Sequence, residues 1–287
     1  MNPHVLALTE FGASAMVMDS ELGIDGYSLY RGNHSDGNGG LGHGVALYIS
    51  DTLNHSACPL FDDVEFDCTA WSCVKMSNNK SLLIGVVYRS PNSPDLNNQN
   101  LLSILKKATS ANYSQVVICG DFNLPRIDWT SRRSLDSEAS FTSKFVEEVN
   151  EMNLFQHVRS STRFRNNQNS CLDLVFTSEE NMVSEVSELP PIGKSDHLCQ
   201  LWEVVVEEVI FKNTASTRHN FKLANWTGIK NELRNFQFEE EDSPTAMNHK
   251  LVKFIGDLKS KYIPLCKARS IQHRLPWMRS AKLKVQR

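Results

Sequence analysis

The sequence lacks several features that mark whole classes of protein. It contains no uninterrupted apolar run of about 18 residues, the length that a membrane-spanning helix needs. Its first residues, MNPHVLALTE, lack the basic region and cleavage-like site of a secretory signal. The seven cysteines include no CxxC pair, which disfavours a zinc site and favours a reducing compartment. We therefore expect an intracellular protein, nuclear or cytoplasmic, that is neither secreted nor membrane-bound.

An excess of charge of one sign is also missing from the whole chain, although not from its parts. The net charge of the 287 residues is −3, and near-neutral proteins are not typical nucleic-acid binders. From residue 206 onward, however, 16 Lys+Arg face 8 Asp+Glu, a net charge of +8, which leaves −11 on the first 205 residues. The sequence thus predicts an acidic body and a basic tail, which is either a solvated helix face or a nucleic-acid contact.

Short apolar runs separated by turn residues fill residues 1–207. Helical spacing of apolar residues occurs near 101–108 and 141–152, between pairs of expected strands. This order predicts a mixed α/β or α+β sandwich. The expected strands are Val5–Thr9, Val45–Ile49, Trp71–Met76, Leu82–Tyr88, Val116–Gly120, Leu172–Thr177, Val183–Glu188 and His197–Val206.

The pattern changes after residue 207. The segments Trp226–Phe236 and Asn248–Tyr262 have helical spacing and are separated by an acidic run and a proline. We therefore expect two parts, a folded domain at 1–207 and a basic helical appendage at 208–287.

The segment Val116–Pro125 is the most informative part of the sequence, because an apolar strand ends there in Gly-Asp-Phe-Asn-Leu-Pro. Asp121 and Asn123 are two residues apart, so their side chains share one face of an extended chain. A carboxylate and an amide at a strand end can bind a hard cation, orient water or contact a phosphoryl oxygen. An Asx turn that only ends the strand is the alternative.

Two further segments offer an acid and a histidine. Ser195, Asp196 and His197 precede an apolar strand, and histidine is the usual general acid or base near neutral pH. Asp173 interrupts an apolar run, where an unpaired carboxylate is unfavourable, so it needs a partner such as a histidine. A capped or solvent-facing aspartate is the alternative for Asp173, and Ser-Asp-His alone is a weak signal.

Two other expected strands end in polar side chains. The first strand leads to Glu10, and the strand from Leu82 leads to Tyr88 and Arg89, followed by Ser-Pro. A guanidinium in such a place could bind a phosphate through two parallel hydrogen bonds. Singly these features are weak, because ordinary strand ends are often polar.

Jointly, the five strand ends resemble one family in their order. The series strand-Glu, strand-Tyr, Gly-Asp-Phe-Asn-x-Pro, Leu-Asp and Ser-Asp-His is similar to the endonuclease/exonuclease/phosphatase superfamily, and most of all to the endonuclease domains of non-LTR (LINE-type) retrotransposons. Tyr-Arg-Ser-Pro at 88–91 and Ile-Asp-Trp at 127–129 are typical of that branch. Pro-Trp-Met at 276–278 resembles the linker that precedes the reverse transcriptase.

The resemblance implies a four-layer sandwich of two mixed β-sheets flanked by helices, followed by a helical linker toward a reverse transcriptase. It also implies Mg²⁺- or Mn²⁺-dependent hydrolysis of DNA phosphodiesters without a small-molecule cofactor. Glu10 and Asp196 would bind the metal, and Arg89 and Ser195 would contact phosphate or DNA. The catalytic residues would be Tyr88, Asp121, Asn123, Asp173 and His197, with Asp173 paired to His197 and Asp121 acting on the attacking water.

One departure from the family pattern matters. Family members begin with a strand that carries an Asn, before the strand that ends in Glu. Glu10 stands too early for that strand, so the chain is expected to be N-terminally truncated. The leading hypothesis is a DNA-nicking endonuclease of a retrotransposon-derived protein. The alternatives are an inactive relic that at most binds nucleic acid, and a phosphatase acting on phosphomonoesters or phosphoinositides, while the oligomeric state is left open.

Overall fold

The computed structural model describes residues 2–13, 17–32, 44–61, 66, 68–165, 168–206, 209–211, 217–237 and 244–267. The chain divides into two compact units, residues 1–212 and 213–287, each of which is described by itself. The basic end of the tail and the Pro-Trp-Met motif at 276–278 lie outside the described residues. The linker role of the second unit therefore stays a prediction.

A six-stranded mixed sheet forms the centre of the first unit. Its strand order is β10-β13-β7-β6-β5-β4, in which β6 and β7 are parallel and every other pair is antiparallel. The apolar runs of β6 and β7 are buried, as expected for central strands covered on both faces. The strands are β4 (His55–Ala57), β5 (Thr69–Lys75), β6 (Ser81–Tyr88), β7 (Gln115–Asp121), β10 (Phe155–Gln156) and β13 (Asp173–Thr177).

A smaller antiparallel sheet of order β1-β3-β2 packs against the central sheet. It consists of β1 (Val5–Leu8), β2 (Tyr27–Gly32) and β3 (Val45–Ser50), and all six residues of β3 are buried. The hairpin of β14 (Val183–Leu189) and β15 (Cys199–Val204) contributes apolar side chains to the same core. Within the described residues, β1 pairs with β3 alone and β15 with β14 alone.

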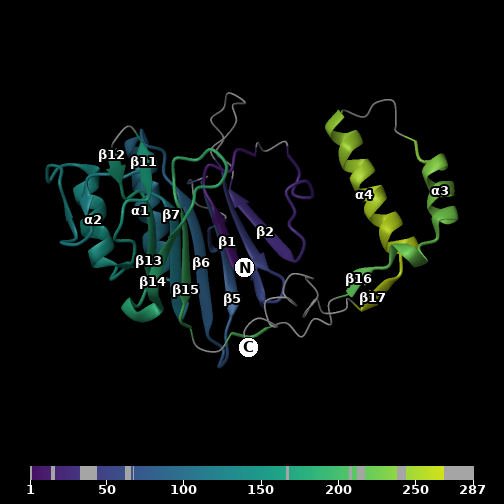
Figure 1. The fold of residues 1–287 in the computed structure, drawn as a ribbon, viewed down its shortest axis with the longest axis horizontal. Coiled ribbons are helices and arrows are strands. Elements are labelled where there is room, and N and C mark those ends of the chain that lie inside the picture. Colours follow the sequence, from purple (N-terminus) through teal and green to yellow (C-terminus); the bar gives the residue numbers. More distant parts are fainter. Residues whose placement is uncertain are drawn as a thin grey trace, which may run out of the picture. The chain divides into compact units, whose positions relative to one another are not determined.

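Two helices complete this unit, at the places where helical spacing predicts them. Helix α1 (Asp95–Ser110) connects the parallel strands β6 and β7, and α2 (Phe141–Glu151) begins at Ser140, whose side chain accepts a hydrogen bond from the Ser143 N–H. Figure 1 shows both helices on one side of the central strands, with β1 and β2 on the other. The predicted mixed α/β class is confirmed.

Short elements connect these layers. They are the strand pairs β8 (Ile127–Asp128) with β9 (Arg133–Ser134) and β11 (Arg163–Arg165) with β12 (Gln168–Ser170), and the 3₁₀ turns η1 (Pro59–Phe61) and η2 (Glu180–Met182).

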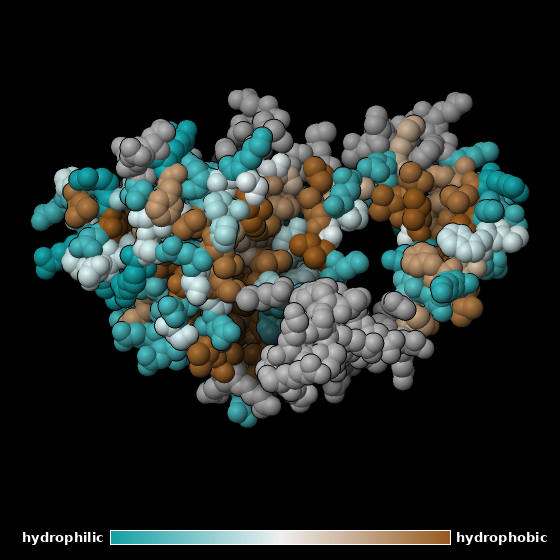
Figure 2. All heavy atoms as spheres, in the orientation of Figure 1, coloured by the Kyte–Doolittle hydropathy of each residue, from teal (hydrophilic) through white to brown (hydrophobic). Residues whose placement is uncertain are grey.

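The second unit is a helical hairpin of α3 (Trp226–Asn235) and α4 (Pro244–Tyr262), preceded by the 3₁₀ turn η3 (Phe221–Leu223) and closed by β16 (Thr217–His219) and β17 (Leu265–Lys267). Its small core contains Ile229, Leu258 and Ile263. Figure 2 shows apolar side chains on the surface of this hairpin, and those that remain exposed are Phe221, Leu223, Trp226, Leu233, Val252, Ile255 and Leu265. No helix in the described part of the chain is long and apolar enough to cross a membrane.

Gly120 precedes the last residue of β7 and adopts φ +142°, a conformation that side chains rarely allow. A Cβ at this position would lie 1.9 Å from the carbonyl oxygen of Val87 on the neighbouring strand. The close approach of the two backbones therefore requires glycine directly before Asp121.

We predict that Gly120→Ala lowers the free energy of unfolding by at least about 3 kcal/mol, because strain at φ is added to a backbone clash. Urea denaturation followed by circular dichroism measures this change. Gly193→Ala is the matched control: Gly193 has φ +63° but nothing within 4 Å of the added Cβ. Its loss should be about 1 kcal/mol, and equal losses in the two variants would contradict the prediction.

Candidate active site

Three predicted site residues lie in one row across the central sheet. Tyr88 at the end of β6 is the register partner of Asp121 at the end of β7, and Asp121 is the partner of Asp173 at the start of β13. Adjacent register partners point to the same face of a sheet. The parallel pairing of β6 with β7 and the antiparallel return of β13 therefore bring together a phenol and two carboxylates that are far apart in the sequence.

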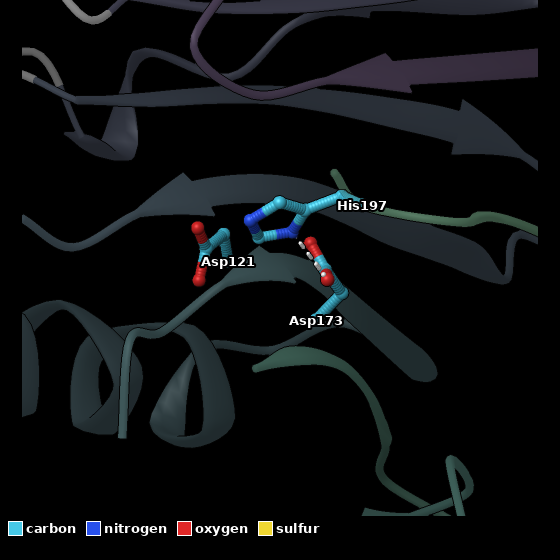
Figure 3. A group of neighbouring side chains, drawn as sticks. All are labelled: Asp121, Asp173 and His197. Carbon is cyan, nitrogen blue, oxygen red and sulfur yellow. Dashed lines mark hydrogen bonds and ion pairs between the residues drawn. The ribbon is translucent and has the colours of Figure 1, made fainter. Parts of the chain in front are cut away.

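His197 reaches this row from the segment that precedes β15. Its Nδ1 lies 2.8 Å from Asp173 Oδ2, so the pairing of Asp173 with a histidine is present. An ionised carboxylate only accepts hydrogen bonds, which places the proton on Nδ1 and leaves Nε2 on the opposite side of the ring. Figure 3 shows the imidazole between Asp173 and Asp121.

Glu10 follows β1 in a left-handed conformation with φ +51° and comes to the same site from the smaller sheet. The Tyr88 hydroxyl donates a hydrogen bond of 2.9 Å to Glu10 Oε1. The two sheets thus meet at the row of strand ends through a carboxylate and a phenol.

Asn123 forms a tight turn with Asp121. The backbone N–H of Asn123 donates to Asp121 Oδ1, and its side-chain amide donates to Asp121 Oδ2; both hydrogen bonds are 2.9 Å long. The same amide group also donates to the Arg89 carbonyl over 2.8 Å. Both amide hydrogens of Asn123 are therefore used within the protein, and the segment forms the Asx turn that the sequence offers as an alternative.

Asp196 and Ser195 lie at the rim of the site. Arg163 Nε donates to Asp196 Oδ2 over 3.0 Å, while Asp196 Oδ1 stands 3.9 Å from His197 Nε2. The hydroxyl oxygen of Ser195 accepts a hydrogen bond from the backbone N–H of His197. Asp196 is thus turned toward an arginine as well as toward the histidine, and Ser195 shapes the loop that presents His197.

The structure corrects the role predicted for Arg89. Only 5% of this residue is exposed, and its guanidinium points inward to Asn98 Oδ1 and to the carbonyl oxygens of Phe122 and Asn123. A guanidinium held in this way has no surface to offer a DNA phosphate. The sequence reading failed because a strand-end arginine has the same signature whether it turns outward or inward.

The carboxylates of the row strongly influence one another. Burial, followed by the charge of Asp173 and more weakly that of Glu10, raises the pKa of Asp121 to about 7. Burial alone would lower the pKa of His197, but the hydrogen bond and charge of Asp173 and the charge of Asp121 outweigh it, so this pKa is raised. Burial and the hydrogen bond to Glu10 also raise the pKa of Tyr88 and keep its phenol protonated.

These residues fit a divalent cation. Ligand atoms of Asp121, Asp173 and His197 all lie within 4.8 Å of one another. Buried like-charged carboxylates are unfavourable without a counter-charge, and the pKa of Asp121 is raised first by burial and then by the charge of Asp173. Carboxylate oxygens are the ligands that hard cations such as Mg²⁺ prefer. The chemistry of the site therefore agrees with a metal at the Asp121 side of the imidazole, where Glu10 also contributes negative charge.

Known proteins share this arrangement of strands. Residues 82–200 match the family model described as endonuclease-reverse transcriptase. The fold is similar to the endonuclease domain of TRAS1, a telomere-specific non-LTR retrotransposon, at 14% identity over 64% of this chain and 81% of that one, with a TM-score of 0.50. It is also similar to the 3′ phosphatase NExo from Neisseria bound to a product DNA hairpin, at 15% identity over 71% and 90% of the two chains, with a TM-score of 0.52.

Over residues 82–200 the sequence is similar to the endonuclease-reverse transcriptase family, and the fold is shared with these two solved structures. The matched residues 82–200 include every predicted catalytic residue, from Tyr88 to His197. No curated protein matches the sequence significantly.

Two residues that help to build this site have no clear signal in the sequence. The Thr162 hydroxyl accepts hydrogen bonds from the backbone N–H groups of Leu172 and Asp173, and Arg163 holds Asp196. Both lie in the polar segment Arg-Ser-Ser-Thr-Arg, which ends on the first residue of β11 and contains no apolar period or motif. The bridge between Arg163 and His197 and the hydrogen bonds of Thr162 bring this segment to the site.

We predict that the metal-free protein loses stability as the pH rises from 6 to 8. A carboxyl whose pKa is raised in the folded state stabilises the fold fully below its ordinary pKa, and this contribution disappears as the pH passes the folded value. For Asp121 the loss begins above the ordinary pKa of an aspartate and is completed as the pH passes about 7, and His197, whose pKa is also raised, changes in the same direction. Thermal melting in EDTA at pH 6, 7 and 8 measures the decline.

Asp121→Asn removes the Asp121 contribution and should flatten the decline, whereas Asp128→Asn, at the end of β8, should leave it unchanged. Comparison of the variants cancels groups such as His157, whose pKa is lowered by burial. Added Mg²⁺ should raise the melting temperature more at pH 8 than at pH 6. Parallel pH profiles for Asp121→Asn and the unaltered chain would contradict the prediction.

Proposed function

We propose that this protein hydrolyses phosphodiester bonds of DNA with a divalent metal, as a nicking endonuclease of a retrotransposon-derived protein. The observation that carries the proposal is the convergence of Glu10–Tyr88, Asp121 and Asp173–His197 at one row of strand ends. The match to an endonuclease-reverse transcriptase model and the fold shared with a retrotransposon endonuclease domain support it.

The side chains suit attack by water on a phosphodiester. Such attack builds negative charge on the phosphoryl oxygens and requires a proton to leave the water. A bound Mg²⁺ or Mn²⁺ would supply positive charge to the phosphate and lower the pKa of a coordinated water. His197, with its Nδ1 proton held by Asp173, presents Nε2 to the site, and in its imidazolium form it can donate a hydrogen bond to a phosphoryl oxygen.

The other side chains at the site have one proposed role each in the reaction. The Asp121 carboxylate is the base that would accept the proton of the attacking water, and Asn123 fixes the orientation of that carboxylate. The protonated phenol of Tyr88 donates to Glu10 in this structure and would donate to the phosphate once Glu10 binds the metal. Ser195 would contact phosphate or DNA at the rim, and Asp196 and Glu10 remain proposed metal ligands.

A plasmid-nicking assay with Mg²⁺ tests the proposal. We expect Asp121→Asn and His197→Gln each to lower kcat by about 10²- to 10⁴-fold, the usual contribution of a positioned acid or base. Asp128→Asn and His157→Gln are matched controls, because Asp128 at the end of β8 bonds Ser131 and His157 bonds Thr177 on β13. Activity of the two site variants equal to that of the unaltered chain would overturn the site assignment.

A phosphatase is the second candidate function, because the similar NExo structure is that of a 3′ phosphatase. Release of inorganic phosphate from a 3′-phosphorylated oligonucleotide, measured beside plasmid nicking, separates the two. Faster phosphate release would favour the phosphatase. Loss of both activities, together with a melting temperature insensitive to Mg²⁺, would favour an inactive relic.

A further inference from the structure

We propose that Arg89 is a positioning residue that holds the turn of Asp121 and Asn123 in its working shape from inside the protein. The role differs from the phosphate contact that a strand-end arginine suggests, and it assigns a purpose to a buried cation. The kinetic part of its test rests on the proposed function, whereas the spectroscopic part does not.

Arg89 and Asn123 bind each other in both directions. The carbonyl oxygen of Arg89 accepts a hydrogen bond of 2.8 Å from the Asn123 side-chain amide, and Arg89 Nη1 donates over 3.2 Å to the Asn123 carbonyl oxygen. The backbone N–H of Arg89 also donates over 2.8 Å to the carbonyl oxygen of Asp121. The main chain and the side chain of Arg89 thus bond both Asp121 and Asn123, the two ends of the turn.

The turn needs this support because its conformation is strained. Asn123 has φ +49°, in the left-handed region that asparagine tolerates better than most residues but does not prefer. Strained residues of this kind persist where the surroundings over-determine them. The amide of Asn123 in turn bonds Asp121 Oδ2, so its orientation sets that of the reacting carboxylate.

The guanidinium is itself anchored to both helices of the first unit. Arg89 Nε donates over 2.8 Å to Asn98 Oδ1 in the first turn of α1, and the Phe141 ring at the start of α2 lies 5.1 Å from the guanidinium carbon. Asn98 is held in place by its own amide, which donates to the Ser93 carbonyl oxygen. The first residues of α1 and α2 therefore hold the Arg89 guanidinium in place, and the guanidinium holds the turn of Asp121 and Asn123.

A purely space-filling role does not explain an arginine here. Burial of a charge is unfavourable, and burial lowers the pKa of Arg89. An apolar side chain of similar length would fill the space with a smaller loss of folding free energy. The planar fork is instead matched to three neutral acceptors in different directions, from Asn98, Phe122 and Asn123. A lysine keeps the charge but lacks this fixed geometry.

The test compares Arg89→Lys with Arg126→Met, in full-length chains. Arg126 is the matched control, because it follows the same turn but is exposed and pairs with Asp136 at the surface. Plasmid nicking gives kcat and KM, calorimetric titration with Mn²⁺ gives the metal affinity, and ¹⁵N-edited NMR of the metal-free chain reports the Asn123 side-chain amide, identified by its absence in Asn123→Asp.

For Arg89→Lys we expect kcat to fall about 10- to 100-fold and Mn²⁺ to bind about tenfold more weakly, as when supporting groups around a site are removed. KM should stay within about twofold, because Arg89 does not touch the substrate. The Asn123 amide signals should move toward the positions of exposed asparagines, and Arg126→Met should change none of these quantities.

Unchanged kcat, Mn²⁺ affinity and Asn123 signals in a folded Arg89→Lys protein would overturn the inference. If Arg89→Lys does not fold, Asn98→Ala replaces it, since this variant removes one anchor of the guanidinium and should shift the same readouts in the same direction. If the unaltered chain does not nick DNA, the proposed function fails, while the Asn123 signals still decide the role of Arg89.

Discussion

The structure depends on one unfavourable placement, the burial of the Asp121 carboxylate beside a second carboxylate. Asp121 is 2% exposed and is the register partner of Asp173, so two carboxylates meet at the buried end of a central sheet. Two backbone features create this placement. Gly120 lets β7 approach Val87 closely, and the left-handed Asn123 returns the chain so that its amide and N–H both bond Asp121.

The surroundings of that carboxylate divide the work of stabilising it. His197 donates its Nδ1 proton to Asp173, which stabilises the negative charge of that carboxylate. The raised pKa of His197 also favours its positively charged form beside Asp173. Asn123 donates hydrogen bonds to Asp121 but carries no positive charge. The Arg89 guanidinium bonds the carbonyl oxygen of Asn123 and not the Asp121 carboxylate. The remaining negative charge lies at Asp121 and Glu10, and a divalent cation is most favourable beside them.

Much of the fold could be predicted because burial leaves a local pattern. The apolar runs at 82–88 and 116–120 are strands, and the helical spacings near 101–108 and 141–152 are helices. Strands β2 and β4 were not predicted, because neither is buried in a way that leaves a local pattern. All residues of β2 are half-buried, and β4 has only three residues at the edge of its sheet, so neither has a strong period.

The amino-acid sequence by itself determined which residues are chemically equipped for the site, because strand ends with Glu, Tyr, Asp-x-Asn, Asp and Asp-His are visible as motifs. Only the tertiary structure decided the direction in which each side chain points. Arg89 turned inward because Asn98 and two carbonyl oxygens lie there, and Arg163 became the partner of Asp196 because a polar loop bridges to His197. Such contacts join residues distant in the chain, and no local period or spacing encodes them.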